Sequence, residues 1–200
     1  MKLNKIFLTA IFIVTMSFSS FSQGGGIWNF QWVIGFPVGE TNEFLDQTSF
    51  RGFGIEGRGY VSDRITVGGR VAWQTFYKDF GEVTQSSDNV TVTGFQRKYI
   101  NTIPITVNAH YYFGYGMVLP YIGVGIGPYW IEARNYMGIY YVQEKAWHFG
   151  VVPEIGVVVP FGSNSNVGFN AAVKYNYAAK TKDTQAQSWV ELDIGISYIF

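Results

Sequence analysis

The 200-residue sequence contains no cysteine, which excludes disulfides, thiolate metal sites and a lipid anchor on an N-terminal cysteine. Charged residues make up only 14%, with 14 basic residues against 14 acidic ones, and no run of Lys or Arg predicts a nucleic-acid partner. No segment reaches 18 consecutive apolar residues or holds a helical period, so we expect no transmembrane helix. What remains is a chain rich in aromatic residues (18%) and glycine (24 residues), an unusual composition for a water-soluble domain.

The first 22 residues are typical of a cleaved signal peptide. Lys2 and Lys5 precede the apolar segment 6–16, which is too short to cross a bilayer core of about 30 Å. Small residues then lead to a cleavage site before Gln23. We therefore expect a signal peptide over 1–22 and one exported domain over 23–200.

Period-two alternation of apolar residues, which indicates a half-buried strand, recurs eight times in the exported part. The last segment, "VELDIGISYIF", shows it most clearly, because every second residue from Val190 to Phe200 is apolar. The eight segments are 28–36, 52–61, 65–77, 100–113, 118–130, 147–159, 167–177 and 190–200. An even number of strands is typical of bacterial outer-membrane barrels.

The segments between these strands alternate in length. Long polar connections are expected at 40–49, 78–97, 133–145 and 178–188, and short ones at 62–64, 114–117 and 161–166. This alternation predicts an all-β fold, an eight-stranded antiparallel up-and-down transmembrane β-barrel. Its long loops lie at one end, and its tight turns and both chain ends lie at the other.

Each strand has one apolar and one polar face, and a soluble lipocalin-like barrel would place the apolar face inward. The surface of a soluble barrel should carry many Lys and Glu side chains. Here the polar faces hold few charges and many glycines, which suits the narrow, side-chain-filled interior of a closed eight-stranded barrel. The composition therefore favours the membrane barrel, with its apolar faces toward lipid.

With the polar faces inward, the lumen holds seven charged residues and two histidines. They are Glu56, Arg58, Arg70, Glu154, Lys174, Glu191, Asp193, His110 and His148. Buried charges are costly unless they are paired, so we expect the register to bring opposite charges together. The turn positions place Glu56 opposite Arg70, and Lys174 opposite Glu154 and level with the two acids of the last strand. The sequence predicts a salt-bridged plug and a largely closed lumen.

The final segment resembles the C-terminal assembly signal of outer-membrane β-barrels, with alternating hydrophobes that end in Tyr198 and Phe200. From Ile27 onward the chain resembles the small outer-membrane β-barrel family, akin to the transmembrane domain of outer membrane protein A and its porin-family relatives. The resemblance implies an outer-membrane location in a Gram-negative bacterium, contact with outer-membrane lipids, and barrel-assembly machinery as a partner during insertion. We expect a monomer without a peptidoglycan-tethering domain.

The sequence offers little that points to catalysis or a cofactor. "GFGIEG" (52–57) matches a dinucleotide-binding pattern, but no helix is expected after it, so glycine is better explained by close packing. Neither His110 nor His148 lies in a motif of a lipid hydrolase, and both fall on the lumen side. No spacing of His and acidic residues predicts a metal site, and we expect no cofactor.

Three functions are compatible with these features. The first is a non-enzymatic barrel with a structural role or a loop-mediated interaction role, in which residues 78–97 contact an extracellular ligand. The second is a narrow pore for small solutes. The third, more distant, is a lipid-modifying outer-membrane enzyme.

Overall fold

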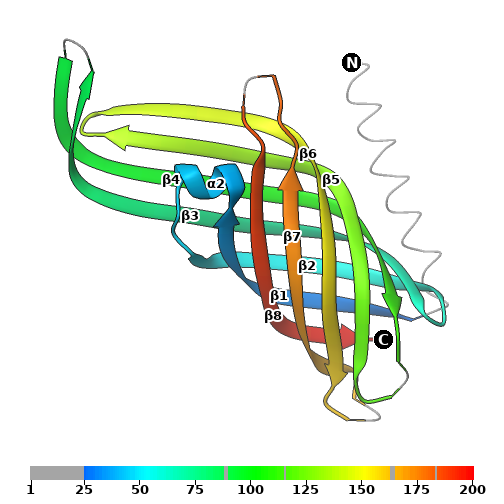
Figure 1. Ribbon diagram of the computed structural model, residues 1–200. Coiled ribbons are helices and arrows are strands. Elements are labelled where there is room, and N and C mark those ends of the chain that lie inside the picture. The colour runs from blue at the N-terminus through cyan, green and yellow to red at the C-terminus, as the bar shows by residue number, and fades with distance from the viewer. Residues whose placement is uncertain (1–24, 88–89, 115, 163–164, 183) are drawn as a thin grey trace, which may run out of the picture.

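The structure, a computed structural model, describes residues 25–87, 90–114, 116–162, 165–182 and 184–200, and the backbone alone at 85–87 and 90–92. Within them, eight antiparallel strands follow one another around a closed barrel, which confirms the predicted fold class (Figure 1). The strands are β1 Gly26–Val38, β2 Ser49–Ser62, β3 Ile65–Ser87, β4 Val90–Tyr112, β5 Leu119–Met137, β6 Tyr140–Pro160, β7 Val167–Ala178 and β8 Gln187–Ile199. The predicted signal peptide lies outside the described residues.

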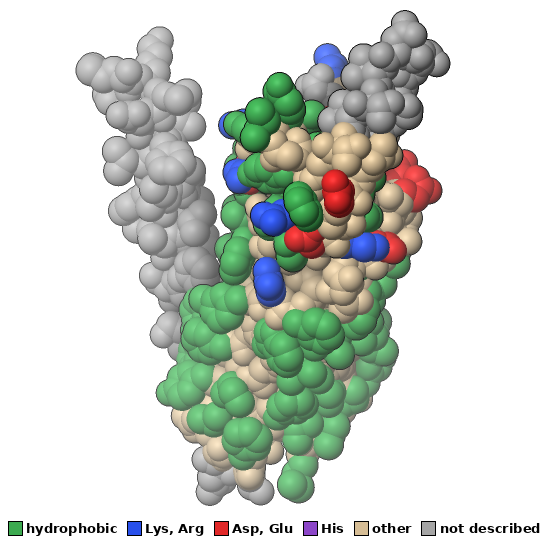
Figure 2. Space-filling view, turned by 90° about the vertical axis from the view of Figure 1, so that its left-hand side faces the viewer, with side chains coloured by type: hydrophobic (Ala, Val, Ile, Leu, Met, Phe, Trp, Pro, Cys, Tyr) green, Lys and Arg blue, Asp and Glu red, His purple; other side chains and the backbone are tan. Residues whose placement is uncertain are grey.

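The two faces of the strands differ as the alternation predicted. On β1, Phe30 and Trp32 are 48% and 50% exposed, whereas Asn29 and Gln31 between them are buried. The same alternation around the barrel turns apolar side chains outward and polar ones into the lumen. Figure 2 shows hydrophobic side chains covering the lower part of one face and charged side chains gathered above them. The apolar belt faces outward, as a bilayer requires.

The barrel closes between the first and last strands. β1 and β8 are paired from Ile27 and Ile199 to Val38 and Ser188. β8 is paired with β1 on one side and with β7 on the other. The alternating segment at the end of the sequence is therefore the closing strand of the barrel and leaves no free edge there.

The prediction of a long loop is wrong for two of the four connections over most of their length. Residues 78–87 and 90–97 continue β3 and β4, which remain paired there, and residues 133–145 continue β5 and β6 (Figure 1). The bulge between Asp79 and Gly81, where Gly81 has a φ of +71°, interrupts the alternation that would have revealed the first hairpin. These two strand extensions project from one end of the barrel, which we call the extended end.

The connection between β1 and β2 begins with a short helix, α2 (Gly39–Phe44), at the extended end. No helix in the described part of the chain is long and apolar enough to cross a membrane.

Candidate functional site

The pairing register brings the predicted lumen charges onto adjacent strands. Glu56 is paired with Arg70, Glu154 with Lys174, and Lys174 with Glu191, as the turn positions predicted. All seven charged residues are 6% exposed or less, so they form one buried cluster inside the barrel.

Lys174 is the central cation of this cluster. Its Nζ lies 2.7 Å from Glu154 Oε2, 3.4 Å from Asp193 Oδ2 and 3.5 Å from Glu56 Oε2. Arg58 bonds Glu56 at 2.8 Å and also donates to the hydroxyl groups of Tyr112 and Tyr121. The cations and carboxylates are therefore within ion-pair distance of one another across the lumen.

The ion pairs do not simply follow the register. Arg70 is opposite Glu56, but its guanidinium reaches across the lumen to Glu191 Oε2 at 2.9 Å and Asp193 Oδ2 at 3.0 Å. Glu191 lies opposite Lys174 in the register, as expected, yet its carboxylate pairs with Arg70 and accepts a hydrogen bond from Trp189 Nε1. A long side chain in a narrow barrel can contact strands that are not its sheet neighbours, and strand pairing alone does not reveal this.

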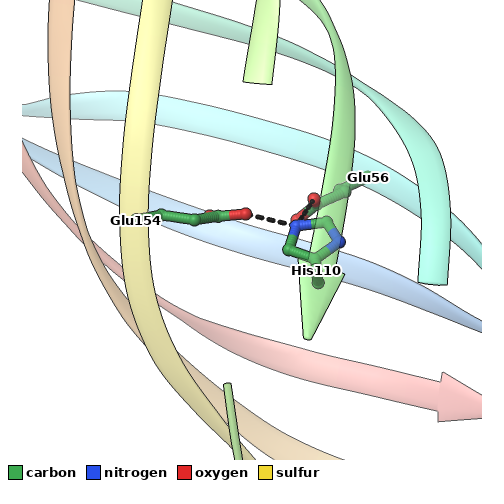
Figure 3. Close-up of side chains that lie close together, drawn as sticks. All are labelled: Glu56, His110 and Glu154. Carbon is green, nitrogen blue, oxygen red and sulfur yellow. Dashed lines mark hydrogen bonds and ion pairs between the residues drawn. The ribbon is translucent and has the colours of Figure 1, made fainter. Parts of the chain in front are cut away.

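His110 lies between two carboxylates of the cluster (Figure 3). Its Nε2 is 3.2 Å from Glu56 Oε1 and in direct contact with Glu154 Oε1, while Nδ1 is 3.2 Å from Thr66 Oγ1. The three side chains come from β2, β4 and β6, so no spacing in the sequence could have indicated the group.

The ligand atoms of these three residues lie within 4.8 Å of one another, close enough to consider a metal ion. However, the second oxygen of Glu56 is held by Arg58, and that of Glu154 by Lys174. With these cations present, the carboxylates have little negative charge left for a divalent ion. Of the two remaining oxygens, Glu56 Oε1 accepts a hydrogen bond from Asn108 Nδ2 at 3.2 Å, and Glu154 Oε1 is in contact with His110 Nε2. The group is therefore better explained as part of the salt-bridged cluster.

Two apolar layers enclose the cluster. Toward the extended end, buried apolar side chains cross the lumen: Leu45, Phe76, Ile100, Tyr129, Ile131, Ala178 and Trp189. Toward the tight-turn end lies a second layer of Ile27, Tyr112, Tyr121, Val158 and Ala172. The charges are thus shielded from water at both ends of the barrel.

Above the first layer, the mouth of the barrel contains a cavity of about 440 Å³. In its wall, His148 Nε2 is 3.2 Å from Thr184 Oγ1, and Nδ1 is 2.8 Å from the carbonyl oxygen of Ala179. A hydroxyl beside an imidazole is one component of nucleophilic catalysis, but Nδ1 here faces a carbonyl instead of a carboxylate.

The outer face of the extended end carries a row of tyrosines whose rings contact one another, which we call the tyrosine band: Tyr77, Tyr99, Tyr136 and Tyr141. The ring centroids of successive members are 4.6, 5.8 and 5.4 Å apart. Arg97 and Arg134 lie among these rings and, together with Phe95, line a groove of about 490 Å³. The sequence prediction missed this surface because it assigned these residues to loops or left their pairing unassigned. The alternation of Arg97 with Tyr99 and of Arg134 with Tyr136 was the available signal.

Each arginine of the groove has a carboxylate partner. Arg97 Nε is 3.2 Å from Asp79 Oδ2, and one Nη of Arg134 is 2.7 Å from Glu132 Oε1. A hydrogen bond from the Gly81 N–H, more than the nearby charge of Arg97, lowers the pKa of the Asp79 carboxyl despite its partial desolvation. Asp79 is therefore ionised at neutral pH and orients Arg97.

The closed eight-stranded barrel, its apolar belt and its charge-filled lumen define a transmembrane β-barrel of the outer-membrane type.

The chain matches no family model and no curated protein. Its fold is that of the small outer-membrane barrels: over 88% of this chain, it superposes on 97% of Neisserial surface protein A with a TM-score of 0.58 and 17% identity. The same share of the chain covers 97% of Ail, the attachment invasion locus protein of Yersinia pestis, in complex with the heparin analogue sucrose octasulfate (TM-score 0.53, 16% identity). It also covers 99% of the N-terminal barrel domain of Pseudomonas aeruginosa OprF (TM-score 0.50, 14% identity).

Proposed function

We propose that this protein is a non-enzymatic barrel of a Gram-negative outer membrane that does not conduct and that binds an extracellular partner through its β3–β4 extension. Outer-membrane barrels have their longer connections on the extracellular side, and this supports an extracellular position for the extended end. The closed lumen supports a role that uses the surface of the barrel more than its interior. Ail, which shares the fold, has been solved with a sulfated ligand, so ligand binding occurs on this architecture.

The observation that carries the proposal is the unpaired edge of β3. β2 is paired with β3 only as far as Gly52 and Gln74, whereas β3 continues to Ser87. Beyond Gln74, the backbone of β3 on the β2 side has no strand partner among the described residues. The carbonyl oxygen of Thr75 accepts a hydrogen bond from Ser49 Oγ, and Lys78 pairs with Asp46 of the β1–β2 connection, so within the described part of the chain the edge is without such contacts from Asp79 to Ser87. An exposed edge of this length is a template for an added strand from another protein.

The pore is disfavoured by the two apolar layers and by the buried cations between them. We expect the refolded protein in a planar bilayer to show no channel steps at moderate voltage. Opening the lumen would separate the buried ion pairs and leave several charges without a partner. A porin reconstituted in the same bilayer serves as the positive control. Regular unitary conductance steps from the purified protein would contradict the closed lumen.

The β3–β4 extension can be tested by removing it while the barrel is kept. Asp79 and Arg97 are opposed in the sheet, so an Asn-Gly turn can replace residues 80–96 without a change of register. We expect a phage-displayed library of extended peptides, selected on the intact protein in nanodiscs, to yield peptides that lose at least tenfold in affinity for the shortened variant.

A matched control alters the neighbouring hairpin instead. Ile139 and Val142 are 89% and 65% exposed, and Ile139→Ser with Val142→Ser removes apolar surface but leaves the edge of β3 intact. The selected peptides should bind this control within about twofold of the wild type, since their strand partner is unchanged. Peptides that bind the shortened variant as tightly as the wild type would refute the binding role.

A further inference from the structure

We propose that the groove at the tyrosine band holds the phosphorylated sugar headgroup of an outer-leaflet glycolipid. This proposal concerns the lipid-facing side of the extension and is independent of the partner bound by the edge of β3.

The height of the groove above the apolar belt favours a sugar headgroup. On β5, Arg134 lies four residues beyond Trp130, and on β4, Arg97 lies six residues beyond Ile103. These separations are about 13 and 20 Å along the strands. At a strand tilt of about 45°, they become about 9 and 14 Å along the membrane normal. The polar layer of a phospholipid leaflet is only about 5–8 Å thick, so the arginines stand at a height that a larger sugar headgroup occupies.

The groups in the groove suit a sugar that carries phosphate. Arg97 is opposite Tyr136, and Tyr99 is opposite Arg134, so the two arginines occupy diagonal positions of the sheet with a tyrosine opposite each. Among the described residues, Arg97 uses only Nε for Asp79, which leaves both Nη groups to donate to a phosphate in a bidentate manner. Tyr99 and Tyr136, which also line the groove, add aromatic surface for the sugar.

The charges around the groove are mixed, which argues against simple attraction of any anion. Asp79 and Glu132 pair with the two arginines, Glu82 lies nearby on β3, and Lys145 is the sheet partner of Glu132. A ligand must therefore use the directed N–H groups of the arginines and not net charge alone. β1, β7 and β8 carry no outward Lys or Arg, since Lys174 of β7 is buried, and this confines the site to one side of the barrel.

The test measures binding of rough-type lipopolysaccharide to the refolded protein in nanodiscs. We expect Arg97→Gln with Arg134→Gln to weaken binding at least tenfold. Lys180→Gln with Lys182→Gln removes two exposed charges from the β7–β8 loop at the same end, and its affinity should stay within twofold of the wild type. Heat-dependent gel mobility verifies that each variant is folded, and single Arg97→Gln, a change at an exposed side chain, replaces the double variant if that fails to refold.

Three further probes separate the possible sources of the ligand. Lipopolysaccharide dephosphorylated with hydrofluoric acid should bind at least tenfold more weakly, and so should phosphatidylglycerol, which has phosphate but no sugar. The proposal would be overturned if the dephosphorylated lipopolysaccharide or phosphatidylglycerol bound the wild type as tightly as intact lipopolysaccharide does. It would also be overturned if the double variant bound intact lipopolysaccharide as tightly as the wild type. A soluble phosphorylated oligosaccharide that binds as tightly as the intact glycolipid would overturn the membrane source.

Discussion

Lys174→Met is expected to lower the free energy of unfolding by about 3–5 kcal/mol, because it removes the cation that faces three buried carboxylates. The Nζ of Lys174 lies within 3.5 Å of Glu56, Glu154 and Asp193, and the side chain is fully buried. Methionine keeps most of the side-chain volume, so the loss reports the unpaired carboxylates and not a cavity. Urea unfolding of the refolded barrel, followed by tryptophan fluorescence and heat-dependent gel mobility, measures the change.

Two further variants separate charge from packing at this position. Lys174→Met combined with Glu154→Gln removes one charge of each sign, and we expect it to recover much of the lost stability. Lys180→Met changes an exposed lysine and should alter stability by no more than about 0.5 kcal/mol. A loss below about 1 kcal/mol for Lys174→Met alone would show that the charge cluster does not stabilise the barrel.

Gly195→Val is expected to prevent closure of the barrel, since a side chain at this position meets backbone across the β1–β8 seam. A Cβ on Gly195 would lie 2.0 Å from the carbonyl oxygen of Phe30 and 2.9 Å from the Cα of Gln31. Backbone cannot move aside as a flexible side chain can, so the cost should reach or exceed the upper end of the overpacking range, about 3 kcal/mol. We expect the variant to yield no compact, heat-modifiable band after refolding.

Gly69→Ala is the matched control for this prediction. The nearest atom to a Cβ on Gly69 is the carbonyl oxygen of Thr106 at 3.6 Å, an ordinary contact. Alanine also reduces the freedom of the unfolded chain, so this variant should refold normally and gain up to about 0.5 kcal/mol. A Gly195→Val protein that refolds like Gly69→Ala would show that the seam tolerates a side chain.

The candidate site was predictable in part. The parity of each strand placed Glu56, Arg70, Glu154 and Lys174 inside the lumen, and the turn positions set which of them are opposed. The partners of Arg70 were not predictable in this way, because its side chain crosses the lumen to β8. Arg70 and its partner Glu191 are 121 residues apart in the sequence. The position of His110 between two carboxylates also depends on three strands meeting in space.

The extended end shows the same limit for the surface. A bulge at Gly81 breaks the period-two pattern, so the sequence of residues 78–97 resembles a loop, although residues 78–87 and 90–97 belong to paired strands. Once β3 to β6 are in register, the rings of Tyr77, Tyr99, Tyr136 and Tyr141 contact one another in one band.

The sequence by itself determined the number of strands, the orientation of their faces and the presence of charges inside, because side chains alternate strictly along a strand and the bilayer selects apolar ones outside. Only the tertiary structure decided which charges meet, how far the strands extend, and where the groove lies. Those features depend on register around a closed barrel and on the reach of long side chains across it, and neither is encoded in a local pattern of residues.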